Sequence, residues 1–142
     1  IDDRVDVAMA VGCEGVHLGQ EDMPVSTARK ILGENFIIGA TAKTVEQAVE
    51  ATKGGADYLG VGAIYPTTTK VKTVLTSTNT LQEICRAVPI RVNAIGGLNR
   101  ENTHILKGTG IAGICVVSAI MKSENPKKEA ETLLSIAKEL VK

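Results

Sequence analysis

The segment GGADYLGVGAIY, residues 54–65, contains the pattern from which the whole chain is built, a glycine-rich turn followed by an apolar run. Such runs recur about every 20–30 residues, which matches a strand–helix–strand unit. The five runs are residues 15–19, 36–42, 57–65, 90–95 and 113–120. Because they are apolar at consecutive rather than alternating positions, we expect parallel strands that are covered on both faces.

The segments between the runs carry apolar residues three and four positions apart, which is the spacing of a helix face. The four stripes are Val25, Ala28, Ile31 and Leu32; Val45, Ala48 and Val49; Leu81, Ile84, Cys85 and Val88; and Ala130, Leu133, Leu134, Ala137, Leu140 and Val141. Residues 44–47 and 80–83 each fit a capping box, and Asn125 followed by Pro126 predicts the start of the last helix.

Five strand–helix units in series leave two architectures, an open doubly wound sheet or a (β/α)8 barrel. The open sheet usually has a GxGxxG motif after its first strand, and the chain lacks one. A complete barrel needs about 250 residues, and five parallel strands alone would leave two apolar edges open. We therefore predict one α/β domain, residues 1–142, that covers the last five units (strands 4–8) of a barrel whose first strands are missing.

The composition argues against nucleic acids and membranes as partners. Lys and Arg number 16 and Asp and Glu number 16, so there is no basic field for nucleic acid or an anionic membrane. No apolar run approaches the ~20 residues of a spanning helix. The three cysteines, Cys13, Cys85 and Cys115, are odd in number and far apart, so we expect buried thiols rather than disulfides or a zinc site. These features favour a cytoplasmic protein that binds small molecules.

Acidic residues stand at two predicted strand ends. Asp2 and Asp3 would follow a strand whose body is missing, and Glu21 and Asp22 follow the first apolar run. The carboxyl ends of parallel strands meet at one edge in both architectures. Mg²⁺ binds one or two carboxylates and completes its octahedron with water and phosphate oxygens. Two interpretations remain open: a magnesium site, or acidic residues that complement helix dipoles.

Candidate phosphate contacts follow the later runs. The block 67–70 offers three threonine hydroxyls and the Lys70 ammonium, which suit phosphate oxygens, although a solvated loop would also contain them. Gly97 follows the fourth run and Ser118 lies in the fifth. If these runs are the seventh and eighth barrel strands, both residues lie where barrels often bind phosphate. A tight turn alone would also explain the glycines.

The two histidines give little functional signal. His17 lies inside an apolar run and His104 in a predicted helix, and neither has a nucleophile near it in sequence. We expect structural roles for both. The sequence offers groups that bind anions and a metal, but no evident general base.

Four stretches of the chain resemble the thiamine-phosphate synthase family, in matching order and spacing along the whole chain. They are GVHLGQED (15–22), GVGAIYPTTTK (60–70), IGG (95–97) and VSAI (117–120). The resemblance implies a (β/α)8 barrel. It also implies a transferase that condenses hydroxymethylpyrimidine diphosphate with thiazole phosphate to form thiamine phosphate. In that reaction diphosphate leaves before the thiazole nitrogen attacks, so no general base is required.

The resemblance further implies roles for individual residues. Mg²⁺ would bridge the diphosphate to Asp3 and Asp22, and Lys70 would be the catalytic cation. The implied pyrimidine-side contacts are Asp2, Thr41 and Lys70. The implied thiazole-phosphate contacts are Thr67, Thr68, Thr69, Gly97, Val117 and Ser118.

Two departures from the family pattern affect these expectations. Asp2 stands where the family usually has asparagine, which removes an amide donor and adds negative charge near a diphosphate. The strand-2 segment with the family's basic diphosphate contacts is absent. We therefore expect the chain to be inactive, or nearly so, unless the missing amino-terminal segment is supplied; a homo-oligomer is a further arrangement that the sequence leaves open.

Two alternative functions remain. One is a thiazole tautomerase of related fold, which would not need the diphosphate-binding groups. The other is a non-catalytic phosphate-binding or regulatory module that retains the ligand loops, because a fold alone does not fix a function. Release of diphosphate that depends on Mg²⁺ distinguishes the synthase from both.

Overall fold

The computed structural model describes residues 1–67 and 74–141, in which five strands alternate with helices as the apolar runs predict. The strands are β1 (Gly15–Leu18), β2 (Ile37–Ala42), β3 (Tyr58–Val61), β4 (Arg91–Ile95) and β5 (Gly113–Cys115). The α-helices are α1 (Val5–Val11), α2 (Val25–Leu32), α3 (Val45–Lys53), α4 (Thr78–Ala87), α5 (Ser118–Met121) and α6 (Pro126–Leu140), and η1 (Thr103–Leu106) is a 3₁₀ helix.

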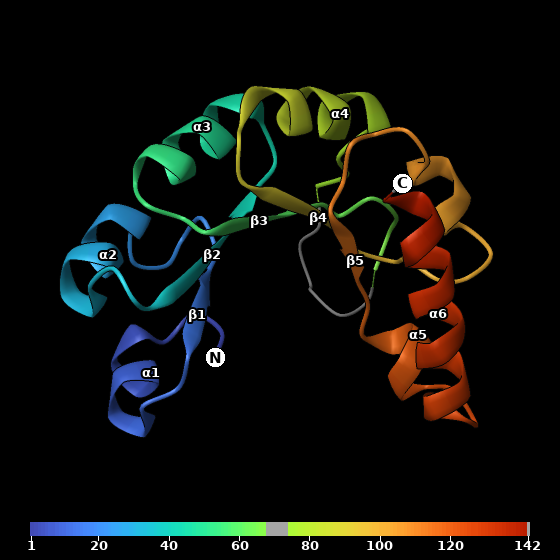
Figure 1. Ribbon diagram of the computed structural model, residues 1–142, viewed down its shortest axis with the longest axis horizontal. Coiled ribbons are helices and arrows are strands. Elements are labelled where there is room, and N and C mark those ends of the chain that lie inside the picture. Colours follow the sequence, from blue (N-terminus) through green and yellow to red (C-terminus); the bar gives the residue numbers. More distant parts are fainter. Residues whose placement is uncertain (68–73, 142) are drawn as a thin grey trace.

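Neighbouring strands pair in parallel, and their order in the described sheet is β1-β2-β3-β4-β5. A doubly wound sheet would reverse its strand order partway along, and this sheet does not. The sheet bends into an arch, and the described helices lie on its outer side (Figure 1). Sequential parallel strands with helices on one side are consistent with a TIM-like (β/α) fold.

The convex face of the sheet holds the core. Alternate strand residues, such as Leu59 and Val61, point toward the helices and are fully buried against Leu81 and Ile84 of α4. A smaller cluster around Leu18 packs under α1 and α2. Each such side chain contributes about 1.5–3 kcal/mol when it is fully buried. The convex face therefore fixes the curvature of the sheet and the direction of its strand ends.

The concave face of the sheet carries the other strand positions, and in the described residues no helix covers it (Figure 1). Ile37 and Ile95 on this face are 49% and 38% exposed. The expectation that both faces are covered is therefore wrong for this part of the chain. The runs look apolar throughout because many concave positions are glycines, which the sequence pattern does not distinguish from buried aliphatic residues.

Two apolar runs extend beyond their strands. β3 ends at Val61, and residues 62–65 form a buried loop in which the Ile64 and Tyr65 amides still donate to the carbonyls of Ile95 and Gly96, at 3.0 Å each. β5 ends at Cys115, and Ser118, predicted within the fifth run, begins α5 instead. Short apolar runs fit a strand, a buried loop or a helical turn equally well, so the sequence could not locate these ends.

The predicted helix starts are correct at two positions and wrong at one. Thr44 accepts a hydrogen bond from the Gln47 amide at 3.3 Å, and Asn125 accepts one from Lys128 at 3.0 Å. The capping box at 80–83 is wrong, because Ser77 caps α4 by accepting from the Thr80 amide at 3.0 Å. Helix α1 was not predicted, because six of its seven residues are apolar and no polar face marks a helical spacing.

The three cysteines are free, as predicted, but they are half-buried rather than fully buried. Within residues 1–67 and 74–141, no helix has the length and apolar character needed to cross a membrane.

Candidate functional site

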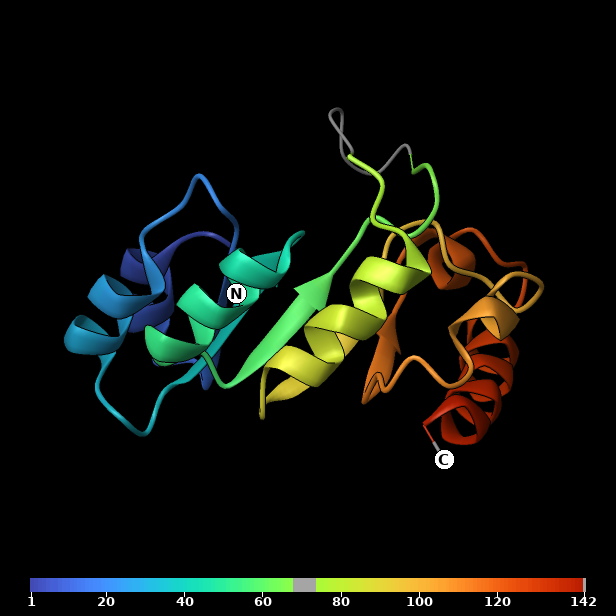
Figure 2. The same cartoon turned by 90° about the horizontal axis from the view of Figure 1, so that it is seen from above.

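Most of the predicted site residues lie near or after the ends of the strands, and Asp2 and Asp3 precede β1 in the chain. In a parallel sheet the segments that follow the strands emerge at one edge, which we call the carboxyl edge. Figure 2 shows the β3 arrow pointing toward the side from which the chain continues to Thr67.

The amino-terminal residues run beside β1 and bring two aspartates to its end. Asp2 forms a parallel bridge with His17, and the Asp3 amide donates to the His17 carbonyl at 2.8 Å. Asp3 has a left-handed backbone, with φ of 67°. The Asp22 side chain turns back and accepts a hydrogen bond from the Gly19 amide at 2.6 Å. Asp3 and Asp22 therefore belong to the same end of β1.

Thr41 lies near the end of β2 and contacts two residues of the β1 region. Its carbonyl accepts a hydrogen bond from the Gln20 side chain at 2.5 Å, and its hydroxyl lies 2.9 Å from Nε2 of His17. These contacts hold Thr41 beside the loop that contains Asp22. The structure thus brings the predicted pyrimidine-side residue Thr41 next to the predicted metal-binding region.

Gly97 joins the end of β4 to the loop that follows β3. Its φ is +65°, and a Cβ there would lie 2.7 Å from both the Pro66 carbonyl oxygen and Cβ of Tyr65. The Asn102 side chain donates to the Gly97 carbonyl at 2.9 Å. Only glycine fits this close approach without displacing its neighbours. Gly97 therefore lies beside the segment that leads directly to Thr67.

The remaining predicted contacts divide into described and undescribed residues. Val117, 54% exposed, precedes α5, and its carbonyl accepts from the amides of Ile120 and Met121 at 3.1 and 2.9 Å. Ser118 is the first residue of α5 and is partly exposed. Thr68, Thr69 and Lys70 lie outside the described residues.

The oxygen donors at the end of β1 fit a hard cation. Mg²⁺ needs only one or two protein carboxylates when phosphate oxygens and water complete its shell. Asp3 and Asp22 could supply them, because only one oxygen of Asp22 is used by the Gly19 amide. In the part of the chain that the structure describes, no three His, Cys, Asp or Glu residues converge on a common point. A cation at this end of β1 would therefore need oxygen ligands from outside the described residues to complete its shell.

The sequence analysis did not predict that His17 and Tyr58 would contact the predicted site residue Thr41. His17, Thr41 and Tyr58 come from three adjacent strands and meet on the concave face: the Tyr58 hydroxyl lies 3.2 Å from Nδ1 of His17, and Thr41 contacts Nε2. His17 and Tyr58 also line a pocket of about 220 Å³ together with Asp2. The available signal was the small size of residues 39 and 60, but using it required the strand register.

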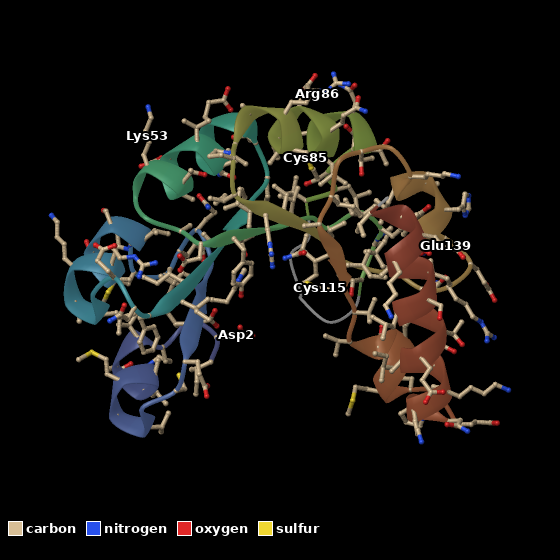
Figure 3. The ribbon with its side chains drawn as sticks, in the orientation of Figure 1. Asp2, Lys53, Cys85, Arg86, Cys115 and Glu139 are labelled. Atoms are coloured by element: carbon tan, nitrogen blue, oxygen red, sulfur yellow. The ribbon has the colours of Figure 1, made fainter. Side chains whose placement is uncertain are left out.

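Burial raises the pKa values of two residues on the concave face. Burial raises the pKa of Tyr58, and the nearby acidic groups of Cys115 and Asp2 raise it further. Burial also raises the pKa of the Cys115 thiol. Figure 3 shows Asp2 and Cys115 on the concave side, whereas Lys53 and Arg86 extend from the outer helices. The phenol of Tyr58 therefore keeps its proton at neutral pH.

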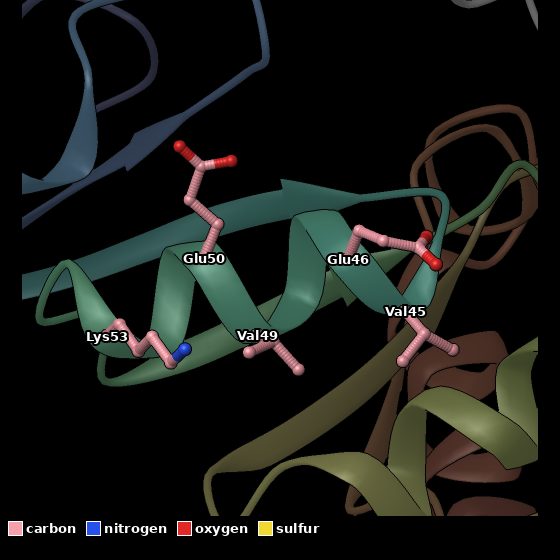
Figure 4. Close-up of a pocket in the computed structure, with 5 residues that line it drawn as sticks. All are labelled: Val45, Glu46, Val49, Glu50 and Lys53. Atoms are coloured by element: carbon pink, nitrogen blue, oxygen red, sulfur yellow. The ribbon is translucent and has the colours of Figure 1, made fainter.

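A second depression, of about 430 Å³, lies on the surface of α3. Its lining residues are Val45, Glu46, Val49, Glu50 and Lys53, all from this one helix (Figure 4). They repeat at helical spacing along the outer side of the arch, and among the described residues no second element contributes a polar group. This depression has none of the converging groups that a ligand site requires.

Comparisons with known proteins point to one family. The family described as thiamine monophosphate synthase matches residues 1–120. Thiamine-phosphate synthase 2 of Streptococcus pneumoniae is 53% identical over 134 residues, and thiamine-phosphate synthase of Ruminiclostridium cellulolyticum is 52% identical over 136 residues. These matches cover 94% and 96% of this chain, but 64% and 65% of the relatives.

The solved structure of thiamine phosphate pyrophosphorylase from Pyrococcus furiosus superposes on this chain with a TM-score of 0.88 at 45% identity. The superposition covers 99% of this chain and 67% of that chain. The chain thus spans about two thirds of the length of the proteins it matches.

Proposed function

The chain belongs to the thiamine monophosphate synthase family, and from this premise we propose that it forms part of a thiamine-phosphate synthase. The proposed reaction condenses hydroxymethylpyrimidine diphosphate with thiazole phosphate and releases diphosphate. The observation that carries the proposal is the meeting of strand-end residues from β1 to β4 at the carboxyl edge, in a chain about half identical to named synthases. Those names favour a synthase over a tautomerase or a non-catalytic module.

We propose that residues 1–142 form one domain that corresponds to the last five βα units, strands 4–8, of a (β/α)8 barrel. The sequential parallel order and the helices on one side of the sheet support this assignment. The unmatched third of the relatives would then supply the first strands and cover the open concave face. Basic groups in that third would bind the diphosphate.

The pyrimidine substrate would be held at the β1 side of the site by Asp2 and Thr41. Asp3 and Asp22 would hold Mg²⁺ against the diphosphate; when bound, the ion neutralises the negative charge of the leaving group. Lys70 would add a second positive charge at the same group. One such electrostatic contact typically contributes about 2.7–4 kcal/mol to lowering a barrier.

The thiazole phosphate would be held at the β4 and β5 side of the site. Threonines 67–69 offer hydroxyl donors, and the Gly97 backbone lets an anion approach closely. Val117 and Ser118 complete the set from the segment after β5. Because the substitution removes no proton from the thiazole nitrogen, these residues need only align the nucleophile with the departing diphosphate.

The test uses the chain alone and a fusion that restores the proposed missing part. In the fusion, the segment that precedes the matched region in the Pyrococcus furiosus protein is placed before Ile1. Both proteins are checked for folded structure by circular dichroism and incubated with both substrates and MgCl₂, and thiamine phosphate is measured by chromatography. We expect product from the fusion, dependent on Mg²⁺, and none from the chain alone.

Other outcomes would change the proposal in defined ways. Product from the chain alone would contradict the need for completion. A folded fusion that binds thiazole phosphate but forms no product would favour a binding module. Conversion of the thiazole without release of diphosphate would favour a tautomerase.

A further inference from the structure

His17 is hydrogen-bonded on the concave face through both of its ring nitrogens. The imidazole lies between two hydroxyl groups, with Nδ1 3.2 Å from the Tyr58 Oη and Nε2 2.9 Å from the Thr41 Oγ1. The rings of His17 and Tyr58 are 5.5 Å apart between centroids and tilted by 34°. A neutral imidazole has one donor and one acceptor nitrogen, so the two hydroxyls must play opposite roles toward it.

Two glycines, on β2 and β3, make room for the two rings. A Cβ at Gly39 would lie 2.2 Å from Cζ of Tyr58 and 2.6 Å from Nδ1 of His17, and a Cβ at Gly60 would lie 3.2 Å from Cε1 of His17. The rings thus occupy space that larger residues on β2 and β3 would fill. The Thr41 main chain is held, because its carbonyl accepts from Gln20.

The acidities of the two hydroxyls decide the direction of the hydrogen bonds. A phenol is a stronger donor than an aliphatic alcohol, and an alcohol oxygen is the better acceptor. The favourable arrangement has the Tyr58 hydroxyl donating to Nδ1 and the Nε2–H donating to the Thr41 oxygen. The raised pKa of Tyr58, caused first by burial, keeps its proton available for this role.

We propose that Tyr58 and His17 are positioning residues that make the Thr41 hydroxyl a hydrogen-bond donor toward a ligand on the concave face. Because Thr41 Oγ1 accepts from His17, its own hydrogen must point away from the imidazole. The ligand atom opposite it is then an acceptor, either a ring nitrogen or an anionic oxygen. This assignment rests on the proposed function where it takes that ligand to be the pyrimidine substrate.

The direction of the hydrogen bonds can be measured without any ligand. The chain has two histidines, so long-range ¹H–¹⁵N spectra contain two imidazoles, and His104 serves as the internal reference because its Nδ1 lies 2.9 Å from the Glu101 carbonyl. At about pH 8.5, well above the usual imidazole pKa, we expect His17 to carry its proton on Nε2. In Tyr58→Phe, the His17 nitrogen shifts should change and those of His104 should not.

Ligand affinity tests whether the network acts on Thr41. Calorimetric titration with hydroxymethylpyrimidine diphosphate should show about fivefold to tenfold weaker binding for Tyr58→Phe, as expected for one neutral hydrogen bond. His17→Asn should weaken binding to the same degree. His17→Gln, whose amide can reach the position of Nε2, should restore most of the affinity. His104→Gln, a surface substitution, should leave it unchanged.

Each result supports or contradicts the proposed direction of these hydrogen bonds. A wild-type His17 protonated on Nδ1 reverses the direction of the hydrogen bonds and overturns the inference. Unchanged His17 shifts and unchanged affinity in Tyr58→Phe reduce Tyr58 to a packing residue, which also overturns it. If the wild-type chain and the fusion both fail to bind the pyrimidine diphosphate, the pyrimidine assignment of the proposed function fails, and the spectra alone decide the network.

Discussion

The two ends of the sheet satisfy their polar groups in different ways. At the amino end, the side chain of Arg29 is only 11% exposed and donates to the carbonyls of Gly55 and Phe36 and to the carboxylate of Asp57, over 2.6–3.0 Å. Asp57 also accepts from the Ile38 amide at 2.7 Å. One long cation thus joins α2 to the starts of β2 and β3.

At the carboxyl edge, short polar side chains, rather than one long cation, make the hydrogen bonds to the backbone. Asp22 binds the Gly19 amide, Gln20 binds the Thr41 carbonyl and Asn102 binds the Gly97 carbonyl. These bonds shape loops but leave other groups available to a ligand. We infer that the amino end serves stability and the carboxyl edge serves binding. Substitutions at the two ends should therefore separate the two properties.

The largest effect is expected for Lys70→Ala, which removes the proposed catalytic cation. Loss of this charge should lower the rate of thiamine phosphate formation by the fusion about 10²–10³-fold, the typical cost of one electrostatic contact to a developing charge. The free energy of unfolding should not change. Lys72→Ala removes a neighbouring lysine as the control and should keep the rate within about twofold. A similar rate for both variants would contradict the assignment.

The largest stability effect is expected at the amino end. Arg29→Met leaves the Asp57 carboxylate without its cation and the carbonyls of Gly33, Phe36 and Gly55 without the Arg29 donor. The free energy of unfolding should therefore fall by about 3 kcal/mol. Urea unfolding measures this value. Lys30→Met, on the exposed side of α2, should change it by less than about 0.5 kcal/mol. Substrate affinity that falls along with stability would show that the two ends are coupled.

Two glycines with nearly equal φ angles test the difference between the two ends. Gly12, before β1, has φ of +64° and no atom within 4 Å of a Cβ, whereas Gly97 has φ of +65° and two atoms at 2.7 Å. Gly12→Ala should cost about 1 kcal/mol from its backbone alone. Gly97→Ala should cost about 2–3 kcal/mol, because Tyr65 and Pro66 must also shift. Titration with thiazole phosphate should show weaker binding for Gly97→Ala only.

A smaller effect is expected for Asp22→Asn, on the Mg²⁺ concentration that the fusion requires. In Asp22→Asn, the Mg²⁺ concentration that gives half-maximal activity of the fusion should rise about tenfold, because one anionic oxygen ligand is lost. The adjacent, exposed Glu21→Gln should leave this concentration unchanged. Chelation of the metal with EDTA should abolish activity in both variants. An equal change for both would indicate general surface charge rather than a ligand.

The smallest effect concerns Tyr58, which begins β3 but whose hydroxyl reaches His17. Because the pKa of Tyr58 is raised, the folded state holds this proton more tightly than the unfolded state. Its contribution to stability is therefore complete below about pH 10 and is lost as the pH rises through the raised pKa. The tyrosinate absorbance difference between wild type and Tyr58→Phe should appear only above about pH 10. A difference at lower pH would contradict the burial of the phenol.

The sequence predicted the start of each strand to within one residue. Parallel strands leave a clear trace of apolar residues after a glycine turn, as residues 54–58 illustrate. The strand ends were harder to predict, because Ala63 and Ile64 are buried in a loop and are as apolar as strand residues. Local sequence reports burial, whereas the end of a strand depends on where its partner stops.

The candidate site was predictable only where a motif is local. The sequence identified Asp22, Gly97 and the block 67–70, and the structure places Asp22 and Gly97 in tight contacts at the carboxyl edge. The sequence assigned His17 a structural role, because its two hydroxyl partners are 24 and 41 residues away. The meeting of three strands depends on register, and register is a property of the assembled sheet.

The neighbour-only order of the strands has a consequence for biosynthesis. In the described sheet, each strand bonds only to the strands just before and just after it along the chain. Pairing can therefore keep pace with a ribosome, which adds about 5–20 residues per second and so supplies one further unit within seconds. Pairing across one strand–helix unit closes a shorter loop than the pairing of distant strands, and so it is the faster of the two. The arch can thus grow from its first unit to its last during translation.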